Sequence, residues 1–242
     1  IVSDDAYIGT VDPVTEAGTG LRVFEDTDNV NVNVIWVSPI RFAGTPVSVW
    51  QKLIEVCTIQ NASAPIDGDK GLSPRGVVDY TNAVGAFTSR SKLDNYRLSF
   101  FWNWWKAEDP DSKAVRWLPP SIAKLRAMAY TYDAFKPWYV SAGEIRGALP
   151  ECLGVEFESL SQGLKNQMYG GGQCVNPIIS RFGSYMLWGN LTTQRTDSKL
   201  TADHAVHCVN HVMKSLAEVG RRFVFDPNDN ELLQQLDMES RE

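Results

Sequence analysis

A run of large aromatic residues near the middle of the chain, YRLSFFWNWWK (residues 96–106), constrains the fold more than any other segment. Its residues alternate with the period of a β-strand, and aromatic side chains occur in both alternating sets. A strand with one face in water pairs an apolar set with a polar set, whereas a strand covered on both faces carries apolar residues in both. We therefore predict a central strand, with Phe100, Trp102 and Trp104 on one face and Phe101 and Trp105 on the other.

The segments around this strand switch between strand and helix periods. Residues 29–39 (NVNVNVIWVSP) predict a strand that enters a core and ends at Pro39, and from Pro46 the spacing becomes that of a helix with Lys52 on its polar side. Further strands are predicted over residues 154–160 and on both sides of Gly183. Further helices are predicted over residues 73–87, after Pro119-Pro120, just before Gly170, from about residue 201, and from about Asn228.

Strands that alternate with amphipathic helices favour an α/β fold. In the helix after Pro119-Pro120, the spacing predicts that the core-facing residues are Ile122, Leu125, Met128, Ala129 and Tyr132. No repeat, charge block or low-complexity tract divides the chain. We therefore expect one continuous domain over residues 1–242, built as a layered mixed sheet with amphipathic helices packed on it around a single core.

The charge balance narrows the class of partner. Asp and Glu number 29 against 23 Lys and Arg, so the formal net charge is −6, which argues against general attraction to nucleic acid or anionic lipid. No apolar run reaches the length of about 18 residues that a transmembrane helix needs, and the N-terminus lacks the regions of an export signal. The four cysteines have no C-x-x-C spacing, which suits a reducing compartment. We expect neither a nucleic-acid partner nor membrane insertion.

A cluster of His204, His207, Cys208 and His211 is the main candidate for a metal site. On a helix these residues occupy one arc of roughly 100°. His204 and His211 are nevertheless separated by about 10.5 Å of helix rise, whereas two nitrogens on one zinc ion lie within roughly 4 Å of each other. His207 and His211 could chelate as a pair, but no other segment supplies the remaining ligands.

The same helix carries an apolar stripe to one side of the histidines. The stripe consists of Ala205, Val209, Val212, Leu216 and Val219, and Thr201 is a candidate N-cap. We therefore favour an ordinary helix that packs through this stripe, with the histidines as a polar flank and Cys208 as a small core thiol. On this interpretation the chain has no metal ligand, cofactor site or catalytic residue.

Other catalytic patterns are weaker still. Ser121 and Lys124 fit S-x-x-K, but Ser89 and Lys92 fit it as well, and neither of the companion motifs of a serine hydrolase follows. Gly170-Gly171-Gly172 lacks the Lys-Ser or Lys-Thr of a phosphate loop, so we interpret it as a helix stop. The carboxylates around Pro110 lie in a polar turn and receive no role.

Several short segments, taken in order, give the most specific signal. The first part of the pattern consists of an aromatic strand, a charged turn, a Pro-Pro-Ser helix start, an Asp, a Trp and an Ala-Gly. The second part consists of an Asn, a Gly-rich turn, a Trp-Gly, a Thr and a Phe-x-x-Asn. The residues concerned are Trp104, Asp109, Pro119-Pro120-Ser121, Asp133, Trp138, Ala142-Gly143, Asn176, Gly183, Trp188-Gly189, Thr192 and Phe225 to Asn228. In this order they resemble the tail sheath proteins of contractile bacteriophage tails, and the resemblance covers most of the chain.

Two departures from the family pattern are evident. The family often has Arg between the Trp-Gly and the Thr, where this chain has Asn190-Leu191, so a contact made by that Arg is expected to be missing. Family members also continue beyond the Phe-x-x-Asn helix into a C-terminal region that joins neighbouring subunits. Because this chain starts without Met and stops at Glu242, we expect a fragment that lacks the joining region.

The resemblance implies a structural and mechanical function, without catalysis or a cofactor. It implies self-association into hexameric rings and helical stacks around an inner tail tube protein, with contraction of the lattice driving the tube through a cell envelope. The expected location is the virion tail, after assembly in the host cytoplasm. A sheath of a phage-tail-like bacteriocin or secretion machine fits the same residues, and the alternative from another class is a metal-dependent enzyme that uses the His204/His207/Cys208/His211 helix.

Overall fold

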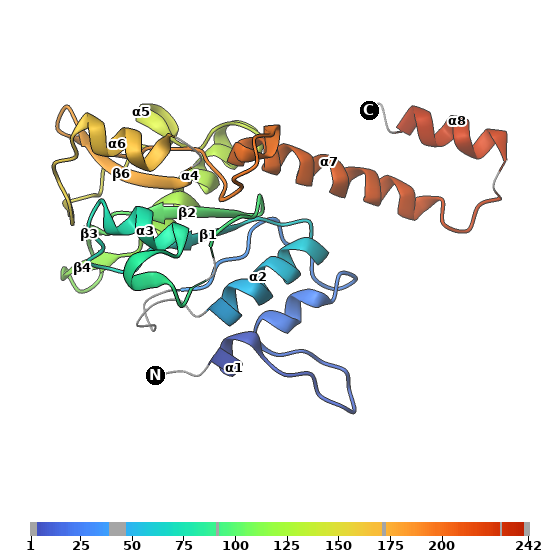
Figure 1. Ribbon diagram of the computed structural model, residues 1–242. Helices are drawn as coiled ribbons and strands as arrows, with labels where there is room; N and C mark the ends of the chain where they lie inside the picture. Colours follow the sequence, from blue (N-terminus) through green and yellow to red (C-terminus); the bar gives the residue numbers. More distant parts are fainter. Residues whose placement is uncertain (1–3, 39–46, 91, 171–172, 228, 240–242) are drawn as a thin grey trace.

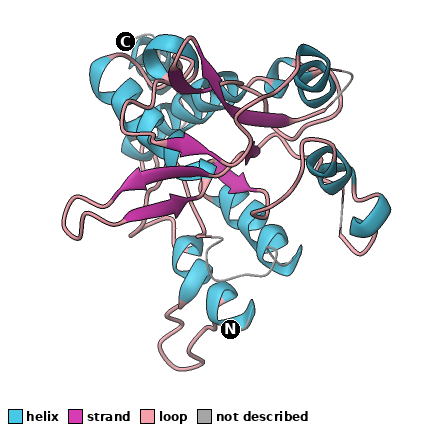
Figure 2. Cartoon of the chain, turned by 90° about the vertical axis from the view of Figure 1, so that its left-hand side faces the viewer, coloured by secondary structure: helices cyan, strands magenta, loops and turns pink. Residues whose placement is uncertain are grey.

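The protein is described by a computed structural model that covers residues 4–38, 47–90, 92–170, 173–227 and 229–239 (Figure 1). Two small sheets lie inside the molecule with helices around them (Figure 2). The helices are α1 (Asp4–Ile8), α2 (Val47–Ile59), α3 (Gly76–Asn82), α4 (Pro120–Ala134), α5 (Gly143–Arg146), α6 (Gln162–Tyr169), α7 (Asp203–Arg222) and α8 (Asn230–Glu239). Short 3₁₀ helices occur at Gly20–Glu25, Gly85–Phe87 and Lys199–Thr201.

The larger sheet has four strands in the order β1-β2-β6-β7. Its strands are β1 (Ala64–Asp67), β2 (Leu98–Trp102), β6 (Val175–Arg181) and β7 (Ser184–Leu187). β1, β2 and β6 run parallel, and β7 returns antiparallel to β6 through a tight turn at Gly183. The aromatic strand β2 is therefore central in a mixed sheet, as predicted.

The aromatic run does not form one strand over its whole length. Asn103 adopts a positive φ of 82° and ends β2, and the chain continues as β3 (Trp105–Glu108) in a second, antiparallel sheet of order β4-β3-β5. Asn tolerates this backbone region, and its buried side chain here donates to the carbonyls of Phe157 and Ile178. The other strands of this sheet are β4 (Val115–Leu118) and β5 (Gly154–Val155).

Helices cover both faces of the four-stranded sheet. Phe100 and Trp102 of β2 pack with α2, α3 and α6 in one cluster of buried residues, whereas Phe101 packs with α4 and the second sheet in another. This alternation confirms that both faces of the aromatic strand are covered. The sheet thus divides the core into two clusters, a division that the sequence does not predict.

Residues 29–38 of the predicted strand do not form a strand of the sheet. Among the described residues, Val34 makes one isolated parallel bridge with Ser63, and the backbone hydrogen bonds there join Ile35 N to Ser63 O and Ser63 N to Asn33 O. Because β1 starts only at Ala64, the segment meets no more than the entry to that strand. Pro39, the predicted strand end, lies outside the described residues.

Two predicted helix faces also need correction. Lys52 is buried on α2, where its ammonium group forms an ion pair with Glu25. On α4 Met128 of the predicted stripe is buried, whereas Ala129 is exposed. Ser121, Lys124 and Thr131 are buried as well, so the buried face is rotated relative to the predicted stripe. Polar partners inside the protein explain the shift, because a buried charge needs a partner that the helix period does not reveal.

Candidate assembly surface along α7

Helix α7 starts inside the protein and then leaves it. Its buried residues, Asp203, Val206, His207 and Asn210, all lie in the first turns, and the described residues after Asn210 are half-buried or exposed. Figure 1 shows the helix projecting from the body, with α8 folded back beside its far end. Ala202 is the N-cap, and the predicted cap Thr201 instead belongs to the preceding 3₁₀ helix.

A buried ion pair anchors the start of α7. The ammonium nitrogen of Lys124 on α4 lies 2.6 Å from Oδ2 of Asp203, and the two side chains are 2% and 3% exposed. The same ammonium group donates to Ser141 Oγ, and Ser99 of β2 donates to the other carboxylate oxygen of Asp203. Burial alone would raise the pKa of Asp203, but the charges of Lys124 and His207 hold it well below its usual range.

The histidines of α7 face different partners. His204 Nδ1 lies 2.6 Å from Asn190 Nδ2, and His207 Nδ1 lies 3.0 Å from the Tyr132 hydroxyl. The ring of His211 lies 5.4 Å from that of Trp138, measured between centroids. Cys208 is half-buried rather than a core thiol. Within the described part of the chain, no group of three or more His, Cys, Asp and Glu residues is placed to hold a metal ion, so the geometry does not support a metal-dependent enzyme.

The apolar stripe of α7 does not pack into the core of its own chain. Val209, Val212 and Leu216 are 42%, 48% and 47% exposed, and Met213 beside them is 44% exposed. The stripe borders a shallow cavity of about 350 Å³ whose far wall is the ring of Trp138. The prediction that this stripe packs the helix is therefore wrong within this chain, and the stripe is instead an open apolar surface of the kind found at interfaces.

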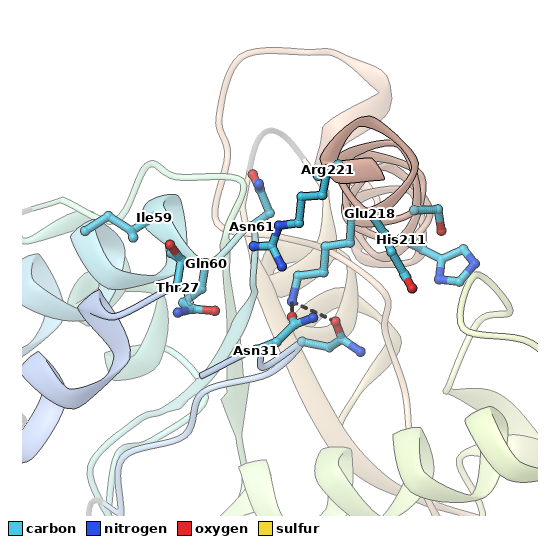
Figure 3. A pocket seen from close by; sticks show the side chains of 12 residues that line it. Thr27, Asn31, Ile59, Gln60, Asn61, His211, Glu218 and Arg221 are labelled. Carbon is cyan, nitrogen blue, oxygen red and sulfur yellow. Dashed lines mark hydrogen bonds between the residues drawn. The ribbon is translucent and has the colours of Figure 1, made fainter. Parts of the chain in front are cut away.

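A polar groove runs along the other flank of α7 (Figure 3). Lys214 reaches across it and donates to Asn31 Oδ1, Val32 O and Asn33 Oδ1 at 2.7, 2.6 and 2.9 Å. Burial lowers the pKa of Lys214, whose partners here are all uncharged. The groove has a volume of about 490 Å³, and Arg221 and Glu218 also line it. These hydrogen bonds hold the middle of α7 against residues 31–33, which lie next to the entry to β1.

Residues of the ordered sheath pattern form turns and helix starts. The amide of Asn176 donates to Phe100 O and Leu191 O at 3.0 and 2.8 Å, and its oxygen accepts from Leu191 N at 2.9 Å. Gly189 has a φ of 131°, and a Cβ there would lie 2.5 Å from Asn176 Oδ1. Two elements of the pattern that are distant in sequence thus meet in one structural joint.

The Pro-Pro-Ser element of the pattern anchors the start of α4 on the sheet. Ser121 starts α4, and its backbone N–H and hydroxyl both donate to Asp67 at the end of β1. Trp36 Nε1 donates to the same hydroxyl at 2.7 Å. Ser121 is fully buried, so these bonds fix the helix start against the sheet.

None of the helices in the described ranges is both apolar and long enough to cross a bilayer.

Comparison with known proteins identifies the fold. No protein-family model matches the sequence, and no curated protein matches it either. The contracted sheath complex of the PVC extracellular contractile injection system matches with a TM-score of 0.70 and 15% identity, over 92% of this chain and 57% of that chain.

Two further structures, one of a baseplate and one of a sheath tail protein, are similar. The anti-feeding prophage baseplate structure matches with a TM-score of 0.58 and 13% identity, over 81% of this chain and 49% of that one. The sheath tail protein of Listeria innocua matches with a TM-score of 0.58 and 10% identity, over 91% and 46%. This chain spans about half the length of the solved chains it matches. The protein therefore has the fold of the sheath proteins of contractile tails and injection systems.

Proposed function

We propose that the protein is a structural subunit of a contractile sheath, which assembles around an inner tube and contracts to drive that tube through a cell envelope. The observation that carries the proposal is the sheath fold, found over 92% of the chain in the structure with a TM-score of 0.70. The ordered sequence pattern supports it independently, because Asn176 and Gly189 meet in one joint and Pro119-Pro120-Ser121 starts α4.

The physical features of the chain fit a mechanical role. Closely packed aromatic rings on both faces of β2 favour a body that keeps its shape when subunits move against one another. Heterologous contacts between identical rigid units generate rings when the rotation closes and helices when it does not. The open apolar stripe on α7 offers one surface for such contacts. Contraction then follows if the extended lattice relaxes to one with better contacts between subunits.

The finer parts of the proposal concern the assembly. We propose hexameric rings stacked as a helix around a tube protein, located in the tail of a virion or of a related injection device and assembled in the producing cell. Work in such a device comes from the difference in free energy between two lattices, so the subunit needs neither a cofactor nor a reacting side chain.

Electron microscopy of the purified full-length protein, which includes the joining region expected beyond this chain, tests the proposal. We expect tubular or ring-shaped polymers at high protein concentration, and we expect Val212→Asp to abolish them, because it places a charge in the open stripe of α7. The matched control Val115→Asp changes a residue that is 56% exposed on β4 and should leave the polymers intact. Monomers at every concentration, with or without a tube protein, would contradict the proposal.

A further inference from the structure

A pocket that combines cations with aromatic rings lies between α6 and β6. It has a volume of about 470 Å³, and its wall includes two cationic, two aromatic and two amide side chains: Lys165, Arg181, Tyr169, Trp188, Gln162 and Asn166. Among the described residues that line it, none carries a carboxylate. We call it the α6 pocket.

The charge of the α6 pocket is only partly compensated. Arg181 forms an exposed ion pair with Glu144 at 3.5 Å, and its guanidinium group lies 5.5 Å from the centre of the Trp188 ring. Lys165 makes no ion pair within the described part of the chain. In a chain of net charge −6, such a pocket favours a ligand that carries both an apolar ring and a negative charge.

The chain itself presents such a group at the connection between α7 and α8. Phe225 is 99% exposed and Val224 is 65% exposed, and Asp226 follows directly. Among the described residues here, Asp226 N donates to Phe223 O at 3.2 Å, Asp229 Oδ1 accepts from Leu232 N at the start of α8, and Arg222 pairs with Glu239 at 3.1 Å. A fully exposed aromatic ring next to an exposed valine resembles an interface anchor without its partner.

The tip and the pocket cannot meet within one copy. Figure 1 shows the α7–α8 connection at one end of the molecule, beyond the projecting length of α7, and α6 with β6 near the other end. A contact between them therefore joins two copies head to tail, which is the heterologous arrangement that propagates into rings or helices.

We propose that Phe225 of one copy inserts between Tyr169 and Trp188 in the α6 pocket of a second copy, with Asp226 beside Lys165 and Arg181. The partner is a second copy of this chain, and the proposal rests on the sheath function because it names one contact of that lattice. The aromatic rings supply the buried area, and the opposite charges set the register of the two copies.

A charge exchange tests the contact by analytical ultracentrifugation. Phe225→Ala should raise the dissociation constant for self-association about 10- to 100-fold, as expected for an anchor residue. Lys165→Glu and Asp226→Lys should each weaken association, and the double variant should restore it, because the two charges are only exchanged. The control Lys136→Glu, at an exposed lysine elsewhere, should have no effect.

Disulfide cross-linking between two variants tests whether the contact joins different copies. In a Cys208→Ser background, one preparation carries Lys165→Cys and the other carries Asp226→Cys. We expect a disulfide-linked dimer in the mixture under mild oxidation and little in either preparation alone. No cross-link in the mixture, together with polymers that survive Asp226→Lys, would overturn this contact while leaving the sheath function standing. Failure of the wild-type full-length protein to associate at all would overturn both.

Discussion

Replacing Lys124 by Met removes the cation that lies against the start of α7. The substitution keeps a side chain of similar length but leaves the Asp203 carboxylate, which is 3% exposed, without its 2.6 Å partner. Removing one member of a buried ion pair costs about 3–5 kcal/mol, because the remaining charge stays buried without its closest cation; among the described residues Asp203 keeps only His207 Nε2, at 3.4 Å, as a basic partner. For a chain of this size that corresponds to a loss of about 6–20 °C in melting temperature.

Urea unfolding followed by tryptophan fluorescence measures the effect. The control is Arg126→Met on the same helix, whose ion pair with Glu151 is exposed, with side chains 41% and 37% accessible, and should contribute no more than about 1 kcal/mol. The double variant Lys124→Met/Asp203→Asn should recover part of the loss, because the buried carboxylate is removed together with its closest cation. A cost for Lys124→Met as small as that for Arg126→Met would refute the reasoning.

Lowering the pH tests the same ion pair through its carboxylate, Asp203. The pKa of Asp203 in the folded protein is well below the ordinary aspartate value of about 3.9, so its carboxylate stabilises the fold above that pH. This contribution is lost as the pH falls through the folded pKa. The difference in unfolding free energy between the wild type and the double variant should therefore shrink below about pH 4.

Two further predictions concern the joints of the sheet. Burial raises the pKa of Asp67 to about 7 despite its hydrogen bonds from Ser121, so the protonated side chain contributes its full stabilisation below about pH 4. As the pH rises to 7, the unfolding free energy should fall by about 4 kcal/mol. Asp67→Asn should remove this fall in urea titrations, and an unchanged pH slope would contradict the assignment. Gly189→Ala should lower the melting temperature by about 4 °C or more, because the new Cβ would clash with Asn176. The control Gly220→Ala places its Cβ in open space and should not lower it. Equal melting temperatures for the two variants would contradict the close contact between Gly189 and Asn176.

Local periodicity predicted most of the fold. The helices α2 and α4, the β6–β7 hairpin and the central aromatic strand all follow from spacing and turn residues. The division of the aromatic run at Asn103 did not, because it depends on side-chain hydrogen bonds to Phe157 and Ile178, far along the chain. Residues 29–38 have the alternation of a strand but meet β1 only at its entry, and alternation does not say how long a neighbouring strand is.

The surface along α7 was predicted less well. The helix period located the stripe of Val209, Val212 and Leu216 but not its partner, because amphipathicity shows that a face needs cover without showing which chain supplies it. Lys124 was missed as a buried residue because its counter-ion lies 79 residues away in the sequence. Single-sequence spacing carries no signal for such a pair.

Cryo-electron microscopy of the assembled protein tests the central claim most directly. The account predicts a hollow helical polymer in which each subunit fits as one rigid body with the β1-β2-β6-β7 sheet intact and α7 lying against a neighbouring copy. A closed dimer with α7 facing solvent, or a chain that stays monomeric under all assembly conditions, would contradict a mechanical role built on contacts between copies.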